Sequence, residues 1–179
     1  MGHAVRAAYM YAGMADVAAL TGDSAYIHAI DRIWDNIVGK KYYITGGIGA
    51  TSNGEAFGKN YELPNMSAYC ETCAAIGNVY VNYRLFLLHG ESKYYDVLER
   101  TLYNGLISGV SLDGGRLFSI PIRWKVSASI SASLGSVVPA ARQCLSFYPL
   151  FAGICLCGEG QGRVCESVYV QYFELEGRG

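Results

Sequence analysis

Three side chains near the middle of the chain carry groups that could perform hydrolytic chemistry. Glu55 lies in a Gly-Glu-Ala-Phe segment, and Glu71 and Cys73 lie in a Glu-Thr-Cys segment further along. A carboxylic acid can transfer protons, and a thiolate next to a carboxylate can bind a soft metal ion such as zinc. The pattern therefore favours acid/base or metal-assisted hydrolysis.

Each of these residues also has an ordinary explanation. Glu55 sits in a glycine-flanked loop, where an acidic side chain is usually only solvated. Glu71 could be an acid favoured at a helix N-terminus, and Cys73 a small buried hydrophobic residue. Residues i and i+2 lie on different sides of a regular helix, so joint metal binding by Glu71 and Cys73 requires an irregular helix start.

The elements that must position these residues are helices and one long loop. Apolar residues recur at helical spacing over 4–38, and Gly22 followed by Asp23 or Ser24 breaks this run into two helices. Residues 39–66 are rich in glycine and predict a loop. Two further helices are expected over about 67–88 and 92–108, which gives an all-α fold.

One helix–turn–helix corner occurs twice. The segment 20–26, LTGDSAY, matches 88–94, LHGESKY, and Arg32 matches Arg100 at the same offset of 68 positions. Repeated helical hairpins need neighbours to bury their apolar faces, so the repeat predicts an α-solenoid or a closed α/α barrel. Chance similarity between two capped turns is the alternative.

Composition excludes some classes of protein. The chain has 179 residues, a net charge of −1 and 51% apolar residues, as in ordinary globular domains. There is no basic patch to favour a nucleic-acid partner, and no apolar run of the ~20 residues that a membrane span needs. The first residues lack the apolar core of a signal peptide and look like an entry into mid-helix, so we expect the protein to begin further upstream. The compartment stays unassigned.

The chain changes character after Phe118. Residues 119–179 contain no Asp, Asn, Thr, His or Met and no clear periodicity. A disordered tail is one interpretation. The redundancy of the genetic code permits another, because a shifted frame over 134–143 can read a Cys-Ala-Cys-Cys-Pro stretch. We therefore predict that 119–179 is translated out of frame, with a second slip near Gln143, and is not natively folded.

Residues 1–118 resemble glycoside hydrolase family 127, the β-L-arabinofuranosidases, almost throughout. The segments that carry the resemblance are GHAVR at 2–6, TGGIG at 45–49, GEAF at 54–57, YELPN at 61–65, ETCA at 71–74 and LYNG at 102–105. The resemblance implies that 1–118 are a fragment of an (α/α)6 barrel. It also implies a retaining hydrolase that releases non-reducing-end β-L-arabinofuranose from plant-derived, arabinofuranoside-containing oligosaccharides.

The resemblance further implies a role for each candidate residue. Glu55 matches the general acid/base, Glu71 and Cys73 match two zinc ligands, and His3 matches a sugar-binding histidine. In this family a zinc-bound cysteine thiolate is the nucleophile, in place of the second carboxylate of most glycosidases. That cysteine belongs to a Cys-Cys pair, and the chain has Val137–Arg142 at the corresponding place. We expect the chain as written to lack the nucleophile, to hold half a zinc site and to be inactive.

Two other classes of function remain open. The chain could be a non-catalytic helical carbohydrate-binding module or a degenerate homologue that keeps only the sugar pocket. It could also be a zinc or redox protein that uses Cys70 and Cys73, although a redox Cys-x-x-C motif would need a βαβ setting that is not visible. On the family interpretation, Cys70 is a structural residue.

Overall fold

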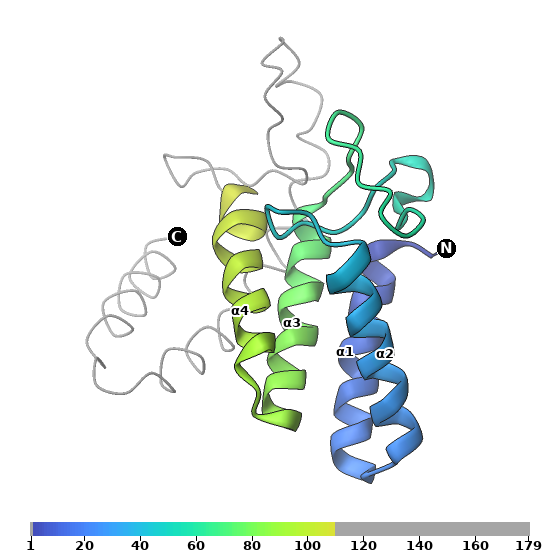
Figure 1. Cartoon of the computed structure of the whole chain (residues 1–179), viewed down its shortest axis with the longest axis vertical. Coiled ribbons are helices and arrows are strands. Elements are labelled where there is room, and N and C mark those ends of the chain that lie inside the picture. The colour runs from blue at the N-terminus through green and yellow to red at the C-terminus, as the bar shows by residue number, and fades with distance from the viewer. Residues whose placement is uncertain (1, 110–179) are drawn as a thin grey trace, which may run out of the picture. The chain divides into compact units, whose positions relative to one another are not determined.

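The computed structural model describes residues 2–109, which form four helices and the loops between them (Figure 1). The helices are α1 (Ala4–Thr21), α2 (Ser24–Lys40), α3 (Thr72–His89) and α4 (Ser92–Arg100), and α4 continues into a π-helical turn (Thr101–Leu106) and a 3-10 turn (Ile107–Gly109). Within this part of the chain only isolated β-bridges occur, so the all-α prediction is confirmed. The predicted out-of-frame segment, 119–179, lies outside the described residues.

None of the helices over 2–109 combines the length and the apolar character that a membrane crossing requires.

Both hairpin corners close in the same way. Gly22 ends α1 with φ 66° and Gly90 ends α3 with φ 71°, a left-handed conformation that glycine adopts without the steric cost of a Cβ atom. After the first corner, the Asp23 side chain accepts a 2.8 Å hydrogen bond from the Ala25 amide and so caps α2. The predicted corner and cap are confirmed.

The sequence repeat corresponds to a structural repeat. Helices α1 and α3 each span 18 residues, and their first residues, Ala4 and Thr72, are 68 positions apart. Helices α2 and α4 begin at Ser24 and Ser92, with the same offset. The repeat is therefore a property of the whole hairpin and extends beyond its corner.

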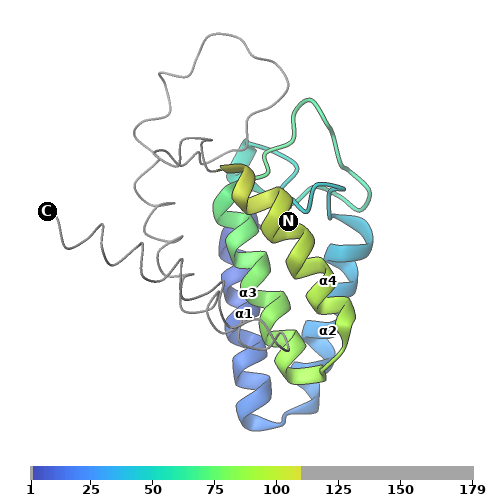
Figure 2. The same cartoon turned by 90° about the vertical axis from the view of Figure 1, so that its left-hand side faces the viewer.

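The two hairpins pack through their first helices. Helices α1 and α3 run side by side in the same direction and have the most extensive contact in the described chain, while α2 and α4 lie against them (Figures 1 and 2). Helix α1 buries small residues along its length, namely Ala4, Ala8, Ala12, Ala15 and Ala18. A Cβ atom at Gly77 of α3 would lie 2.8 Å from the Cβ of Ala8, so the close approach requires glycine there.

A chain of buried and partly buried polar groups joins the two hairpins. The Trp34 indole donates to Asn82 Oδ1 at 2.7 Å, and the Asn82 amide donates to the Asn78 carbonyl at 2.7 Å. Asn78 donates in turn to Thr101 Oγ1 at 3.2 Å, and the Tyr42 hydroxyl lies 2.9 Å from the same oxygen. Because an unpaired buried polar group is costly, this chain favours one arrangement of the helices over others.

Candidate active site

The loops gather at one end of the helices. The segment between α2 and α3 lies at the end where α1 and α3 begin (Figures 1 and 2). His3 and Glu71 are the residues that immediately precede α1 and α3, and both have extended ψ angles, 123° and 145°. They are 68 positions apart, so the repeat itself brings these two predicted site residues to the same end.

Glu55 stands on a tight loop with an unusual backbone. Gly54 has φ 68° and Glu55 itself has φ 48°, a left-handed conformation that costs a non-glycine residue about 1–2 kcal/mol. Three hydrogen bonds close the loop and fix it to the start of the chain: Ala56 N to Thr51 O at 3.1 Å, Ala50 N to Ala56 O at 3.0 Å, and Phe57 N to Gly2 O at 3.2 Å. Strain held in this way by surrounding contacts is typical of functional positions.

The loop brings Glu55 onto His3. Glu55 Oε2 lies 2.7 Å from His3 Nε2, with side chains 41% and 22% exposed. The other ring nitrogen, His3 Nδ1, is buried and has no hydrogen-bond partner among residues 2–109. The pair therefore combines a partly exposed carboxyl group with a histidine whose second ring nitrogen is buried and unsatisfied within residues 2–109.

Glu71 lies deeper than Glu55 and is electrostatically coupled to it. Glu71 is only 8% exposed, and burial, followed by the charge of Glu55, raises the pKa of Glu71 to about 7. Glu71 precedes α3 in an extended conformation, and Cys73 lies in the first turn of that helix. The helix thus starts at Thr72, later than the predicted residue 67, and the irregular start needed for Glu71 and Cys73 to act together is present.

Tyr69 is a site residue that sequence reasoning did not select. Burial, and then the negative charges of Glu71, Glu55 and Cys73, raise the pKa of the Tyr69 hydroxyl. Tyr69 is therefore close to all three predicted chemical groups. One of fifteen tyrosines, it is marked in the sequence only by its place two residues before Glu71.

The Thr-Gly-Gly-Ile-Gly segment holds this part of the site in place. A Cβ atom at Gly47 would lie 2.9 Å from Cys70 Sγ, and one at Gly49 would lie 2.6 Å from the Tyr69 carbonyl oxygen. Gly49 O accepts hydrogen bonds from Tyr69 N at 3.2 Å and from Cys70 Sγ at 3.4 Å. These contacts occupy the backbone ahead of Glu71 and explain why the helix does not begin earlier. They also agree with a structural role for Cys70.

The described residues do not form a metal site by themselves. Among residues 2–109 no group of three His, Cys, Asp or Glu side chains is placed to hold a metal ion. Glu71 and Cys73 supply at most two of the four ligands of a tetrahedral zinc site. The position of the expected Cys-Cys pair, Val137–Arg142, lies outside the described residues.

Comparisons with known proteins give a consistent result. Residues 1–125 match the family described as β-L-arabinofuranosidase, GH127 catalytic domain. A non-reducing end β-L-arabinofuranosidase from Bifidobacterium longum is 43% identical over 119 residues, which are 66% of this chain and 18% of that protein.

Solved structures agree with this match. A GH127 β-arabinofuranosidase is 82% identical with a TM-score of 0.65, and a GH127 β-L-arabinofuranosidase from Geobacillus stearothermophilus T6 is 48% identical with a TM-score of 0.65. Each alignment covers 66% of this chain and 19% of the other. The chain thus spans about a fifth of the length of these relatives.

Proposed function

The chain belongs to the β-L-arabinofuranosidase GH127 catalytic family, and we propose that the protein it represents releases non-reducing-end β-L-arabinofuranose from plant-derived oligosaccharides with retention of configuration. The observation that carries the proposal is the pairing of the strained Glu55 with His3, 2.7 Å apart, beside the buried Glu71. The surrounding fold would be an (α/α)6 barrel, of which α1–α4 are two hairpins.

Glu55 is assigned the proton transfers. Its carboxyl group is partly exposed and can reach a glycosidic oxygen, to which it gives a proton as the leaving group departs. It then takes a proton from the water that attacks the glycosyl–enzyme intermediate of a retaining hydrolase. His3 orients Glu55 through Nε2 and, as the family resemblance implies, lies beside the bound sugar.

Glu71 and Cys73 are assigned to a zinc site that needs two more ligands. When bound, zinc keeps a cysteine thiol deprotonated near neutral pH and fixes its direction. Residues 1–179 lack the Cys-Cys pair that would complete the site and supply the nucleophile. We therefore derive no step through the metal, and we propose that the chain as written is inactive.

The test begins with the gene. Resequencing from codon 110 to beyond codon 179 should reveal a frame that encodes a Cys-Ala-Cys-Cys-Pro stretch. The protein from the repaired full-length gene should then hydrolyse p-nitrophenyl β-L-arabinofuranoside. Glu55→Gln should lower kcat by about 10²–10⁴, the usual contribution of acid/base catalysis. Glu99→Gln, an exposed carboxylate on α4, is the matched control and should leave kcat unchanged.

A non-catalytic carbohydrate-binding homologue is the second candidate, favoured by the missing Cys-Cys pair. A frame that stands as written, with binding of L-arabinose but no hydrolysis, would support it and refute the enzyme. A zinc protein built on Cys70 and Cys73 would lose its metal on Cys70→Ser. The family proposal predicts that, of these two substitutions, Cys73→Ser abolishes metal binding by the repaired protein and Cys70→Ser does not.

A further inference from the structure

One side chain of the loop that carries Glu55 is placed to hold that loop in shape. Thr51 is half-buried where the loop begins, whereas Ser52 and Asn53 are exposed. The Thr51 hydroxyl oxygen accepts a hydrogen bond from the Asn53 amide at 3.1 Å. A threonine or serine that bonds in this way to the amide two residues later bends the backbone between them. The bend after Thr51 is therefore specified by a side chain as well as by the backbone.

The backbone of Thr51 closes the same loop. Its carbonyl oxygen accepts a hydrogen bond from the Ala56 amide at 3.1 Å, and its own amide donates to the Ala56 carbonyl at 3.3 Å. Between these two residues the Glu55 amide donates to the Ser52 carbonyl at 3.3 Å, and both Gly54 and Glu55 have a positive φ. Glu55 thus lies one residue before the loop rejoins Thr51, so the direction of its side chain depends on how the intervening residues fold.

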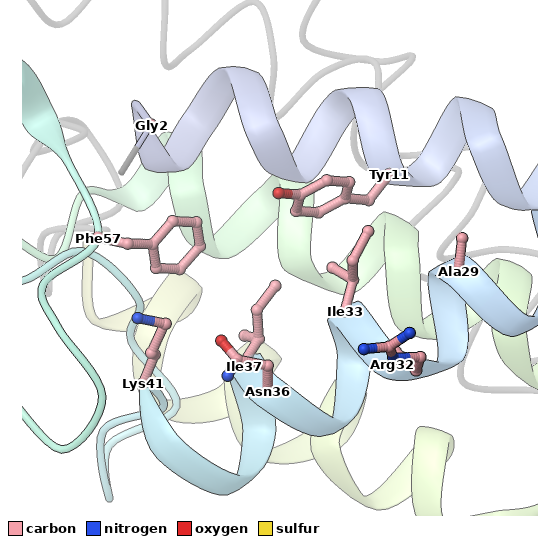
Figure 3. A pocket seen from close by; sticks show the side chains of 9 residues that line it. All are labelled: Gly2, Tyr11, Ala29, Arg32, Ile33, Asn36, Ile37, Lys41 and Phe57. Atoms are coloured by element: carbon pink, nitrogen blue, oxygen red, sulfur yellow. The ribbon is translucent and has the colours of Figure 1, made fainter.

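The far end of the loop is fixed by other contacts. Phe57 is 7% exposed, and its amide donates to the Gly2 carbonyl at 3.2 Å. The Phe57 ring and the Lys41 side chain both line one open pocket beside α2 (Figure 3). The Lys41 ammonium group donates to the Gly58 carbonyl at 2.7 Å. These contacts hold the chain from Phe57 onward, whereas the turn that carries Glu55 is shaped by its own local hydrogen bonds.

From these contacts we propose that the Thr51 hydroxyl positions Glu55 for its proton transfers. Without the hydroxyl the exposed Asn53 amide can bond to water instead, so the fold loses little stability. The bend is then no longer fixed, and turns in which Glu55 has a negative φ become accessible because they relieve its backbone strain. In those turns the carboxyl group moves away from His3 Nε2, which lies 2.7 Å from it in the structure. Thr51 acts through Glu55 and is a positioning residue; the inference rests on the proposed function.

The test uses the protein from the repaired full-length gene and two substrates. p-Nitrophenolate departs readily without a proton, whereas the methoxide of methyl β-L-arabinofuranoside needs one, so a misplaced general acid slows hydrolysis of the methyl glycoside more. Thr51→Val removes the hydroxyl and keeps the branched shape, whereas Thr51→Ser keeps the hydroxyl. Thr51→Ala also lacks the hydroxyl and should behave as Thr51→Val does, which separates loss of the hydroxyl from any misfit of the valine.

The quantity to compare is kcat/KM, which reports the step that forms the glycosyl–enzyme intermediate. For Thr51→Val we expect kcat/KM on the methyl glycoside to fall by about fivefold to tenfold, the effect of one lost hydrogen bond, and on the p-nitrophenyl glycoside by less than about twofold. Thr51→Ser should match the parent on both. Thr21→Val is the matched control: Thr21 Oγ1 accepts the same kind of bond from the Asp23 amide, at 3.3 Å, in the corner after α1. It should leave both rates unchanged.

Three results with an active parent enzyme would overturn the positioning role of Thr51. The first is parent-like rates of Thr51→Val on both glycosides, and the second is an equal loss on both, which would show a general structural effect. The third is a loss that Thr51→Ser shares, which would show that the hydroxyl is not the group that acts. A parent enzyme that hydrolyses neither glycoside would instead refute the proposed function, and this inference with it.

Discussion

At the scale of single residues, we expect the burial of Glu71 to make the stability of the fold depend on pH. The pKa of its carboxyl group is raised from 4.5 to about 7 in the folded chain by burial and by the charge of Glu55. As pH rises, the unfolded chain loses this proton first, so the free energy of unfolding falls between about pH 4.5 and 7 and is level above that range. The cost in free energy of unfolding at pH 8 has an upper bound of about 3 kcal/mol.

Glu71→Gln should remove this dependence. In the presence of a chelator, urea unfolding of the variant should give a free energy about 1–3 kcal/mol higher than that of the parent chain at pH 8 and an equal one at pH 4. Glu99→Gln, exposed on α4, should follow the parent chain at both pH values. A variant that is less stable than the parent at pH 8 would show that ionised Glu71 is stabilised by the fold.

The backbone of Glu55 gives a second prediction. Both Glu55→Ala and Glu55→Gly remove the carboxylate, but only glycine adopts φ 48° without strain. The glycine variant should therefore be more stable than the alanine variant by about 1 kcal/mol in urea unfolding. At Glu91, where φ is −93°, the same pair of substitutions should not favour glycine. A glycine advantage of equal size at both positions would refute stored strain at Glu55.

Residue types alone suggested Glu55, Glu71 and Cys73 as candidates, whereas His3 and the role of each residue came only from the family resemblance. His3 and Glu55 meet because the loop at 50–57 folds back on the start of the chain. Neither the spacing of these residues nor any sequence periodicity predicts that contact. Tyr69 was missed because its importance comes from the charges around it and not from its own pattern. Residue types suggest chemistry, but loops bring the residues together. The loop that carries Glu55 is held to the start of the chain by a hydrogen bond between residues far apart in the sequence, Phe57 N to Gly2 O.

At the scale of elements, Gly46 in the connection between α2 and α3 should not tolerate a side chain. A Cβ atom at Gly46 would lie 2.7 Å from Thr101 Cα, and its φ of 84° is unfavourable for alanine. Gly46→Ala should therefore lower the free energy of unfolding by more than about 2 kcal/mol, as overpacking and backbone strain add. Gly13→Ala, with nothing within 4 Å of its Cβ atom in the interior of α1, should raise it by about 0.5–1 kcal/mol. Chemical denaturation of the two variants measures both free energies of unfolding. Changes of the same sign in the two variants would contradict the prediction.

The elements were predictable where local signals decide them. The corners at Gly22 and Gly90 follow from glycine, with the Asp23 cap added at the first, and helical periodicity placed α1, α2 and α4 closely. The start of α3 and the π-helical turn at Thr101–Leu106 were not predicted. The start of α3 depends on the Gly49 carbonyl, which accepts hydrogen bonds from the Tyr69 amide and from Cys70 Sγ, and the π-helical turn lies where the Gly46 backbone packs closely on Thr101. Both involve partners distant in sequence, which a local pattern does not contain.

At the scale of the whole molecule, the repeat implies that two hairpins are not a complete unit. Hairpins of this kind bury one face against each neighbour, so a terminal hairpin leaves a face uncovered. Here that face includes Met10, Val17 and Leu20, which are 57%, 41% and 87% exposed. Contiguous apolar surface of this kind promotes association, and we predict that the isolated chain aggregates or has poor solubility.

Charged substitutions should show whether self-association is caused by the uncovered face of α1 or by any exposed apolar residue. Met10→Lys with Val17→Lys places two charges on the uncovered face of α1 and should shift the chain toward a monodisperse monomer in size-exclusion chromatography with light scattering. Ile44→Lys removes an even more exposed apolar residue, 92% accessible, from the loop segment and should have little effect. If the unmodified chain is already a monodisperse monomer that melts cooperatively, the uncovered face does not drive association, and the requirement for a neighbouring hairpin loses its physical basis. If only the α1 variant improves, the face that the repeat marks as an interface is the one that drives self-association.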